Sequence, residues 1–490
     1  MATKKKTTKQ PTRAIERVLF ATGEAMPFLR SGGLGDVAGA LPQALRKEGV
    51  DCRVIMPLYS NIPTDYTDTM RFVGRTYVNL GWRTQYCGIF QSAAGGVTYY
   101  FVDNEYYFRR NTMYGQYDDA ERFAFFSKAV LEALSIIDFA PQIIHCNDWH
   151  TAMIPVFLDV FYRGVDKLAG VKTVFTIHNI EFQGKYDIAL AREICALPDE
   201  SIPLVEYGGA LNFLKGGIEC ANAVTTVSPT YAHELQDPFY AYDLDSILKS
   251  RKYKISGIIN GIETDLYNPA TDSALFVPFD ATCPEKRADN KKALCEMLDL
   301  NYRADRPLIS MISRLTTQKG LDLVLAVAEE LLAADIQLVI LGTGEWRFEN
   351  GFKELERRYS AKMRVIINFS KDLAGKLYGS SDMFLMPSKF EPCGLSQMIA
   401  MRYGAVPIVR ETGGLKDSVS PYNPTTKEGL GFTFYAYNAH EMLGAIWRAV
   451  DMYYNDKENW QQIIRNDMAT DFSWAVSAAK YADLYEGLLK

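Results

Sequence analysis

The sequence lacks the features that mark membrane proteins, disulfide-rich proteins and nucleic-acid-binding proteins. No apolar run approaches the roughly 20 residues that a membrane-spanning helix needs. The eight cysteines include no Cys-x-x-Cys pair, which favours free thiols in a reducing cytosol over a disulfide framework. The net charge of −6 does not provide the broad basic surface that nucleic-acid binding requires. These absences predict a cytoplasmic protein with neither a membrane nor a nucleic acid as partner.

A metal centre is not predicted either. His145 and His150 are too irregularly spaced for a helical zinc pair, and no second cluster of ligands accompanies them. At the N-terminus, basic residues are followed only by the short apolar run Val18–Ala21, which is too short for a secretory signal. Residues 1–16 are therefore predicted to be a basic, disordered tail, with a short transit peptide as the alternative.

The composition and length are those of a two-domain globular protein, with 490 residues that are 48% hydrophobic and 23% charged. Apolar strands alternate with helical patterns in two series, which predicts an α/β protein with two doubly wound parallel sheets. The strands of the first series are predicted at Arg17–Ala21, Arg53–Met56, Ile143–Cys146, Val171–Ile177 and Ala223–Val227. Those of the second series are predicted at Leu308–Ser313, Gln337–Leu341, Arg364–Asn368, Met383–Met386 and Val406–Val409.

A domain boundary is predicted near residues 256–268. The turn-forming pair Asn260-Gly261 lies there, and the stretch after it has little periodicity. The predicted domains are residues 17–257 and 258–472. The last segment, Trp474–Leu488, has apolar residues at helical spacing and is predicted to be an amphipathic helix that packs against one of the domains.

A glycine-rich segment, Arg30–Val37, follows the first predicted strand and opens a helix. Glycines at a helix N-terminus let backbone N–H groups approach an anion. The spacing is not that of a dinucleotide fingerprint, because Gly33 and Gly35 are followed by Gly39 and the next strand ends without a carboxylate. A tight turn that serves only packing is the alternative.

Two further polar clusters follow strands of the first series. Asp148 and His150 come after one strand, and His178 and Asn179 come after the next. Ligands of open α/β sheets bind beyond the carboxyl ends of strands, so both clusters are expected to face one crevice. Histidines that only support the scaffold are the alternative.

The second series carries a cationic segment and an acidic one. Arg314 and Lys319 follow a strand and could clamp a diphosphate, although solvated surface charges are the commoner fate of such residues. Glu391 lies in a proline-bounded loop before a helix, where it could hold sugar hydroxyls or act only as a helix N-terminal acid. The turn at Gly413 and Gly414 is suited to phosphate oxygens.

Taken together, these motifs resemble one known family. The motifs that carry the resemblance are, in chain order, SGGLGDV, NDWH, TIHN, NGIE, SRLTTQKG, FEPCGL and TGGL. By these motifs the chain resembles the bacterial glycogen synthases and plant starch synthases, glycosyltransferase family 5. The resemblance runs from about Val18 to Leu489. It implies a GT-B fold with two Rossmann-like domains and a final helix, residues 473–490, that returns to the N-terminal domain. It also implies retaining transfer of glucose from ADP-glucose to the non-reducing end of an α-1,4-glucan, without metal or cofactor.

The resemblance assigns site residues motif by motif. The residues that it implies for catalysis are Asp148, His178, Arg314, Lys319 and Glu391. Those that it implies for donor binding are Arg30, Gly32, Gly33, Asp36, Asn260, Phe369, Cys393, Gly394, Leu395, Gly413 and Gly414.

The chain departs from the family pattern at one visible position. Arg30 stands where the family loop usually has lysine, and the two cations are not interchangeable at a phosphate or ring contact. UDP-glucose therefore stays an alternative donor. The motifs also leave open a catalytically silent glucan-binding protein on the same fold, and a different GT-B enzyme such as a glucan phosphorylase or a sucrose-type synthase. Oligomeric state is not predicted.

Overall fold

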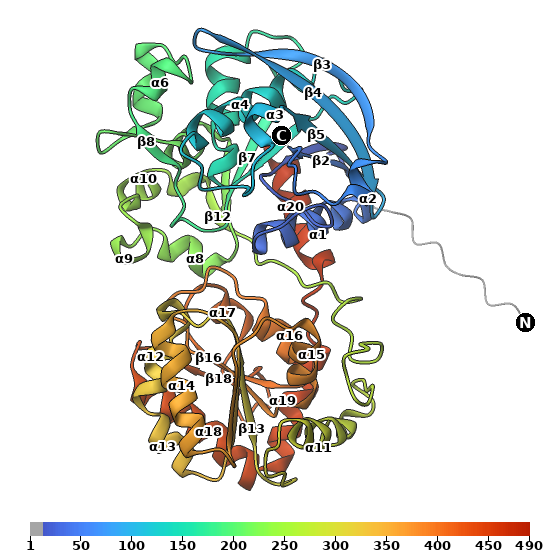
Figure 1. The fold of residues 1–490 in the computed structure, drawn as a ribbon, viewed down its shortest axis with the longest axis vertical. Coiled ribbons are helices and arrows are strands. Elements are labelled where there is room, and N and C mark those ends of the chain that lie inside the picture. The colour runs from blue at the N-terminus through green and yellow to red at the C-terminus, as the bar shows by residue number, and fades with distance from the viewer. Residues whose placement is uncertain (1–12) are drawn as a thin grey trace, which may run out of the picture. The chain divides into compact units, whose positions relative to one another are not determined.

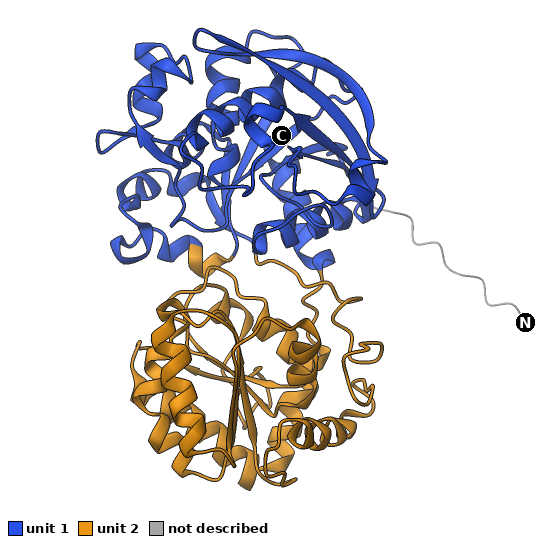
Figure 2. Cartoon of the chain, in the orientation of Figure 1, with its two compact units in different colours: residues 1–227, 232–258, 474–490 blue, residues 228–231, 259–473 orange. Residues whose placement is uncertain are grey.

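The computed structural model describes residues 13–490, which form two compact units. Unit 1 contains the described residues up to 227 together with 232–258 and 474–490, and unit 2 contains 228–231 and 259–473 (Figure 2). The predicted N-terminal domain differs from unit 1 at residues 228–231. They belong to unit 2 because Ser228 Oγ donates to the Pro392 carbonyl at 2.8 Å and Thr230 bonds to Asp417.

Unit 1 is built on a nine-stranded sheet in the order β12-β11-β7-β6-β1-β2-β5-β4-β3 (Figure 1). Its strands from β12 to β5 are parallel, and β4 and β3 extend the sheet as an antiparallel hairpin. The strands are β1 Arg17–Ala21, β2 Asp51–Pro57, β3 Arg71–Leu80, β4 Arg83–Ala94, β5 Val97–Asp103, β6 Ile143–Asn147, β7 Lys172–Ile177, β11 Ala223–Thr226 and β12 Ile255–Gly257. The five strands predicted for this half are confirmed. A small sheet is added by β8 Lys185–Asp187, β9 Glu206–Tyr207 and β10 Ala210–Asn212.

The helices of unit 1 connect these strands, and the last of them is the C-terminal helix of the chain. They are α1 Gly33–Lys47, α2 Thr64–Thr67, α3 Glu105–Phe108, α4 Asp119–Ala133, α5 Met153–Phe157, α6 Leu190–Glu193, α7 Phe213–Cys220, α8 Pro229–Glu234, which begins in unit 2, α9 Pro238–Ala241, α10 Asp245–Ser250 and α20 Trp474–Leu489. Helix α20 packs beside α1 (Figure 1). Its Tyr485 hydroxyl lies 2.7 Å from His145 Nδ1 on β6, so the end of the chain is bonded to the central strands of unit 1.

The start of the described chain is held in place too. Ile15 is buried, and Arg13 forms ion pairs with Glu48 and Asp483 at 2.9 and 2.8 Å. The prediction of a disordered tail is therefore wrong for residues 13–16, because an apolar side chain and an ion pair tie them to α1 and α20. Residues 1–12 of the predicted tail lie outside the described residues.

Unit 2 has a six-stranded, wholly parallel sheet in the order β15-β14-β13-β16-β17-β18. Its strands are β13 Leu308–Ile312, β14 Gln337–Leu341, β15 Met363–Ile366, β16 Met383–Met386, β17 Val406–Arg410 and β18 Phe432–Phe434. Its helices are α11 Arg287–Met297, α12 Leu321–Ala326, α13 Ala328–Ala333, α14 Trp346–Arg358, α15 Lys371–Ser380, α16 Ser396–Arg402, α17 Gly413–Ser418, α18 Ala439–Asn455 and α19 Lys457–Ala469. The predicted α/β class with two parallel sheets is confirmed.

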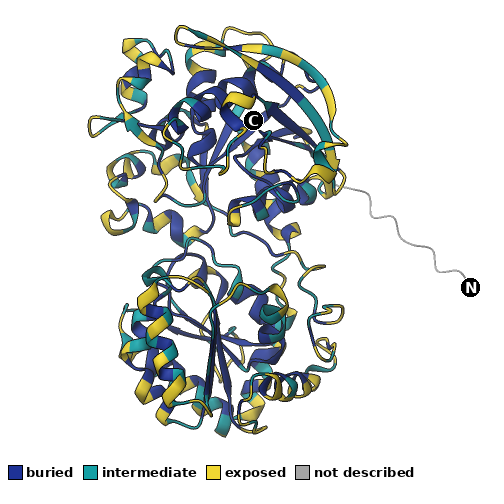
Figure 3. Cartoon of the chain, viewed as in Figure 1, coloured by how far each residue is buried: buried dark blue, intermediate teal, exposed yellow. Residues whose placement is uncertain are grey.

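The burial pattern explains why the strands of unit 2 could be recognised as apolar runs. β14, β16 and β18 are buried along their whole length, because helices cover both faces of the sheet (Figure 3). Side-chain caps begin several helices, as where Ser370 Oγ accepts from Leu373 N at 3.1 Å at the start of α15. Among residues 13–490, no helix combines the length and apolar character that a bilayer crossing needs.

Candidate active site

Three adjacent strands of unit 1 bring Glu24, Asp148 and His178 to one edge of the sheet. β1, β6 and β7 are parallel neighbours, and these residues follow their carboxyl ends. Such an edge is where open α/β sheets bind ligands. The expectation that the Asp148 and His178 clusters share one crevice therefore agrees with the sheet order, and Glu24 is added to them.

Glu24 organises the glycine-rich segment, a role that sequence reasoning missed. Its buried carboxylate accepts from Ser31 N at 2.5 Å, from Ser31 Oγ at 2.7 Å and from Gly35 N at 3.1 Å. Burial raises the pKa of Glu24, and these hydrogen bonds oppose the rise. The amides that the sequence predicted to meet an anion thus surround a carboxylate of the chain itself. The signal that could have revealed this role is the position of an acidic residue shortly after a strand and before a glycine-rich turn.

Within the same segment, Arg30 forms an ion pair with Asp36. Its guanidinium is therefore neutralised by the chain, as is that of many partly exposed arginines. Gly32 and Gly33 have open space where a side chain would stand, since an added Cβ atom at either position meets nothing within 4 Å. A ligand can approach the backbone of these two glycines closely.

Asp148 is held in a strained backbone conformation. Its φ is +58°, in the region that favours glycine, and it is not a glycine. The side chain is buried and accepts from His178 N at 2.7 Å and from the backbone N–H of Asn179. Burial raises the pKa of Asp148 to about 7, although the two backbone donors lower it. Strain together with a carboxyl poised near neutrality is typical of a functional site.

His178 is neutral at physiological pH. Burial lowers its pKa to about 3, and its Nε2 lies 2.9 Å from Asn147 Oδ1, to which it donates. The imidazole is therefore positioned as a hydrogen-bonding group and not as a cation. His150, by contrast, is enclosed by aromatic rings, with ring centroids 4.1 Å from Trp149 and 4.2 Å from Tyr114. That arrangement supports a packing role for His150.

The raised pKa of Asp148 predicts a pH-dependent gain of stability in Asp148→Asn. An unfolded aspartate ionises near pH 4, so between pH 4 and 7 the unfolded chain gives up a proton that the folded chain keeps, and stability falls as pH rises. The asparagine variant should lose this dependence. Its free energy of unfolding in urea should exceed that of the parent by an amount that grows from pH 4.5 to pH 7 and is constant above, on the order of a few kcal/mol. A difference that does not change with pH would contradict the account.

The edge of unit 2 at the carboxyl ends of its strands gathers most of the remaining predicted residues. The sheet order places the segments after β15, β14, β13, β16 and β17 side by side along this edge. These segments begin with or contain Phe369, Gly342, Arg314, Glu391 and Gly413. Residues from distant parts of the chain thus lie along one edge of the sheet.

Lys319 and Glu391 form the centre of this edge. Lys319 Nζ lies 2.5 Å from Glu391 Oε2, and the same oxygen accepts from Ser388 Oγ at 3.1 Å. The side chain of Glu391 is 9% exposed and that of Lys319 is 16% exposed, so the pair is shielded but reachable. Ser388 was not predicted from the sequence, because a lone serine carries no signal of its own.

Glycines allow the loops of this edge to touch. A Cβ atom at Gly413 would lie 2.1 Å from the Glu391 carbonyl oxygen, and one at Gly414 would lie 1.9 Å from that of Cys393. The Gly414 N–H donates to the Glu391 and Pro392 carbonyls at 3.1 and 3.2 Å. The Gly414 amide is therefore occupied, and the turn allows close approach of the two loops. Phosphate binding at this turn stays a prediction.

Asn260 joins the same region of unit 2. Its backbone N–H donates to the Cys393 sulfur, and its buried side-chain oxygen has no hydrogen-bond partner. Burial raises the pKa of Cys393 to about 12, so the thiol is neutral. Gly394 has a φ of +71°, and Leu395 precedes the first turn of α16. The unpartnered oxygen of Asn260 is suited to a ligand donor.

Two predicted residues extend into solvent. Phe369 is 77% exposed, and Arg314 is exposed, with no hydrogen bond or ion pair from its side chain to another residue of the described chain. An exposed aromatic ring and an exposed, unpartnered cation at a ligand-binding edge are both available for contact with a ligand. Within the described chain, no three or more His, Cys, Asp and Glu side chains gather as a metal site would need.

The predicted site residues thus belong to two groups, one in each unit. In unit 1 the structure brings together Asp148 with His178, and Arg30 with Asp36 beside Gly32 and Gly33. In unit 2 it brings together Lys319, Glu391, Gly413, Gly414 and the Cys393–Leu395 turn with Asn260. Arg314 and Phe369 follow strands at the same edge of the sheet as the second group.

Comparisons with known proteins match both halves of the chain. Residues 17–250 match the family described as starch synthase catalytic domain, and residues 298–467 match glycosyl transferases group 1. The glycogen synthase of Anoxybacillus flavithermus is 50% identical over 475 residues, covering 96% of this chain and 98% of that protein. The glycogen synthase of Clostridium novyi is 50% identical over 476 residues, covering 96% and 99%.

Solved structures agree with the sequence comparisons. The catalytic domain of starch synthase IV from Arabidopsis thaliana, bound to ADP and acarbose, is 34% identical with a TM-score of 0.86 and covers 97% of this chain and 99% of that one. Sucrose-phosphate synthase from Thermosynechococcus elongatus, at 16% identity and a TM-score of 0.59, covers 96% and 99% and shares the fold. The chain belongs to the glycogen synthase and starch synthase family of glycosyltransferases, with the GT-B fold.

Proposed function

We propose that the enzyme transfers glucose from ADP-glucose to the non-reducing end of an α-1,4-glucan with retention of configuration. The observation that carries this proposal is the shielded Lys319–Glu391 pair, fixed by the Gly413 turn at the ligand-binding edge of a parallel sheet. The presence of ADP and acarbose in the related starch synthase structure supports the same two partners here. The family match supports glucan synthesis over the reactions of a phosphorylase or a sucrose-type synthase.

The reaction breaks the bond between the anomeric carbon and a phosphate oxygen, and negative charge develops on the departing diphosphate. Cations placed in advance around that charge supply much of the rate. Arg314 is exposed and unpartnered, so its guanidinium can bind two phosphate oxygens. Lys319 has three N–H donors, of which one is directed at Glu391 and two can bind a phosphate.

Glu391 holds the sugar and Lys319 at once. One of its oxygens accepts from Lys319 and Ser388, which leaves the other for a glucosyl hydroxyl. Fixing a hydroxyl beside the cation orients the anomeric carbon relative to the leaving group. By family resemblance, Asp148 and the neutral His178 are assigned to the binding of a glucosyl ring.

Retention follows if attack and departure take place on one face of the sugar. The acceptor hydroxyl then gives its proton to the departing phosphate oxygen, a new bond forms at the anomeric carbon, and the diphosphate carries the proton away. This step needs no base from the protein. A double displacement through a carboxylate would instead form a covalent glucosyl-enzyme.

We assign to Phe369 the role of stacking against the nucleobase of the nucleotide sugar. Stacking of a base on an aromatic ring contributes about 1–3 kcal/mol, and this ring is largely exposed at the same edge as Lys319. Phe369→Ala should therefore raise KM for the nucleotide sugar by tenfold or more while lowering kcat less. Initial rates over a range of donor concentrations measure both constants. Loss of kcat at unchanged KM would remove the stacking role.

Product analysis tests the proposed function. The enzyme, ADP-glucose and a maltooligosaccharide should give chains longer by whole glucose units, with one ADP released for each unit added. The added units should be removed by β-amylase, which cleaves α-1,4 bonds from the non-reducing end. Release of glucose without chain growth, or products that resist β-amylase, would contradict the proposal.

We also propose a cytoplasmic location. All eight cysteines are free, and six of them are buried. Unpaired thiols are typical of a reducing compartment.

A further inference from the structure

A cavity of about 250 Å³ lies in unit 2, at the edge of the sheet opposite to the candidate active site. Asp382, which lines it, directly precedes β16, so the cavity is at the amino ends of the strands. The remaining walls come from the start of α11, the segment 302–304, the end of α18 and the first turns of α19. Nothing in the proposed transfer reaction uses this place.

One residue that lines the cavity, Arg287, is a buried cation with an unused donor. Arg287 is 7% exposed, and one of its terminal nitrogens donates to the Ser381 carbonyl. Its Nε is buried and has no hydrogen-bond partner. Gly404 leaves room for this side chain, since a Cβ atom there would lie 3.3 Å from Arg287 Cδ and Nε. An unsatisfied buried donor of this kind calls for an acceptor.

A second unsatisfied donor lines the same cavity. The Ser380 hydroxyl is buried without a partner, and Ser380 is 2% exposed. Ser380 ends α15, directly before the residue whose carbonyl holds Arg287. Two donors without acceptors therefore belong to one small space.

The cavity is lined by three cationic side chains, Arg287, Lys291 and Lys457, and by two carboxylates, Glu285 and Asp382. Lys291 and Asp382 neutralise each other, with Lys291 Nζ 2.7 Å from Asp382 Oδ2. Lys457 at the exposed rim lies over the Tyr453 ring, 3.8 Å from its centroid, and the carboxylates of Asp382 and Asp305 act on its charge. The buried carboxyl of Asp467 also acts on Arg287, and its two oxygens have no hydrogen-bond partner.

The carboxyl of Asp467 does not line the cavity. Burial raises the pKa of Asp467 well above its usual value, although the charge of Arg287 opposes the rise. Two helices also begin at the cavity, α11 at Arg287 and α19 at Lys457. Both direct the positive ends of their dipoles toward it, which favours an anion.

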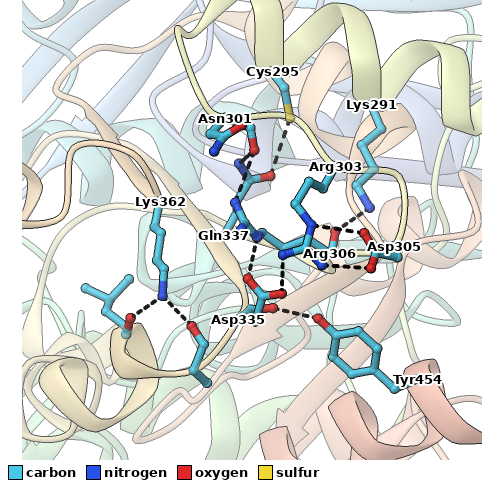
Figure 4. A network of polar contacts seen from close by, with 12 residues as sticks. Lys291, Cys295, Asn301, Arg303, Asp305, Arg306, Asp335, Gln337, Lys362 and Tyr454 are labelled. Atoms are coloured by element: carbon cyan, nitrogen blue, oxygen red, sulfur yellow. Dashed lines mark hydrogen bonds and ion pairs between the residues drawn. The ribbon is translucent and has the colours of Figure 1, made fainter.

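One part of the wall is aromatic and is held in place by packing and hydrogen bonds. Tyr302, Tyr453 and Trp460 line the cavity, and Trp460 is held against Tyr453 with ring centroids 5.2 Å apart. The segment that carries Tyr302 is fixed by a polar network (Figure 4). In it, Arg306 Nε bonds to Asp335 at 2.6 Å, and Lys291 Nζ bonds to the Arg306 carbonyl at 2.6 Å.

The volume decides the size of the ligand. At about 30 Å³ for each water, the cavity has room for about eight waters, which is more than inorganic phosphate fills. Its cationic donors and aromatic rings match an anion joined to a small organic ring.

We propose that this cavity binds a small phosphate monoester, with the phosphate on Arg287, Ser380 and Lys457 and the organic part against Tyr453 and Trp460. The site is distinct from the nucleotide-sugar site, because the two lie at opposite edges of one parallel sheet.

Calorimetric titration of the full-length enzyme tests the proposal. The probes are inorganic phosphate, a hexose monophosphate and a nucleoside monophosphate, each with and without saturating ADP to fill the nucleotide-sugar site. A monoester should bind with ADP present, and more tightly than inorganic phosphate. Lys457→Glu should weaken that binding tenfold or more, and Ser380→Ala should weaken it less. The matched control Lys480→Glu makes the same charge change at an exposed position on α20 and should leave binding unchanged.

Because Lys457 and Lys480 are both exposed, neither variant endangers folding. Trp460 supplies a second readout: monoester binding should change the tryptophan fluorescence of the parent, and Trp460→Phe should lose most of that change. No monoester binding at 10 mM in the presence of ADP would overturn the proposal. Binding that ADP displaces fully, or that Lys457→Glu and Lys480→Glu alter equally, would overturn it as well. None of these results bears on glucose transfer, so the proposed function is tested separately.

Discussion

Arg314→Ala should lower kcat by about a hundredfold or more, the loss typical of removing one preorganised donor from a developing anion. The reason lies in the placement of this side chain. Arg314 follows β13 at the ligand-binding edge of unit 2, and no residue of the described chain neutralises it. Its charge is therefore available to the diphosphate, and its removal leaves only Lys319 at that position. Steady-state rates at saturating donor and glucan measure the effect.

The same substitution should leave the fold intact, because an exposed side chain without partners contributes little to stability. The melting temperature should match that of the parent. Arg357→Ala is the matched control, since Arg357 is an exposed arginine of unit 2 on α14 whose side chain is 75% exposed and pairs with Glu354. The control should keep full activity. Near-normal turnover in Arg314→Ala would show that the electrostatic account is wrong.

Glu391→Gln should also lower kcat by about a hundredfold or more. The amide keeps the size of the carboxyl and an oxygen for Ser388, but it removes the charge that holds Lys319 2.5 Å away. A freed Lys319 and a weaker acceptor for the sugar hydroxyl both misplace the anomeric carbon relative to the leaving group. The effect should appear in kcat more than in donor KM, because the orientation matters most in the transition state.

A control separates this effect from a loss of charge in general. Glu354→Gln removes a carboxylate on α14 whose side chain is 57% exposed, and it should change neither kcat nor melting temperature. If Glu391→Gln kept kcat within twofold of the parent, the carboxylate would have no role in orienting the sugar. Unfolding of the variant is not expected, because the glutamine still accepts from Ser388.

The sequence predicted five strands in each of the two large sheets, because a strand covered on two faces reads as a short apolar run, as at Gln337–Leu341. It did not predict the long hairpin of β3 and β4. Most residues of β3 are exposed or half-buried, so its sequence mixes polar and apolar side chains without a clear run. The short β18 was also missed, since three residues carry little pattern.

The site could be predicted as residue types at strand ends but not as contacts. Glu24 satisfies the glycine-loop amides, and the Gly414 amide satisfies the Glu391 carbonyl. Both contacts depend on how the loops meet in space. The ion pair of Arg30 with Asp36 is of the same kind, since spacing alone does not show which charges face each other.

The cavity at Arg287 had no signal in the sequence. It forms where α11, α15, α18 and α19 converge, and these helices are separated by up to about 180 positions along the chain. Each of its polar residues alone reads as an ordinary helix-terminal or surface group. Only the packing shows that Arg287 and Ser380 are buried without partners.

We propose that this member of the glycogen and starch synthase family uses ADP-glucose as its glucosyl donor. This proposal is tested most directly by the initial rate of transfer of labelled glucose to glycogen, with ADP-glucose and UDP-glucose compared at equal concentrations in the presence of a metal chelator. The account predicts incorporation from ADP-glucose that persists with the chelator and clearly exceeds that from UDP-glucose. A higher rate from UDP-glucose would contradict the assigned donor, and no incorporation from either donor would contradict the assigned reaction.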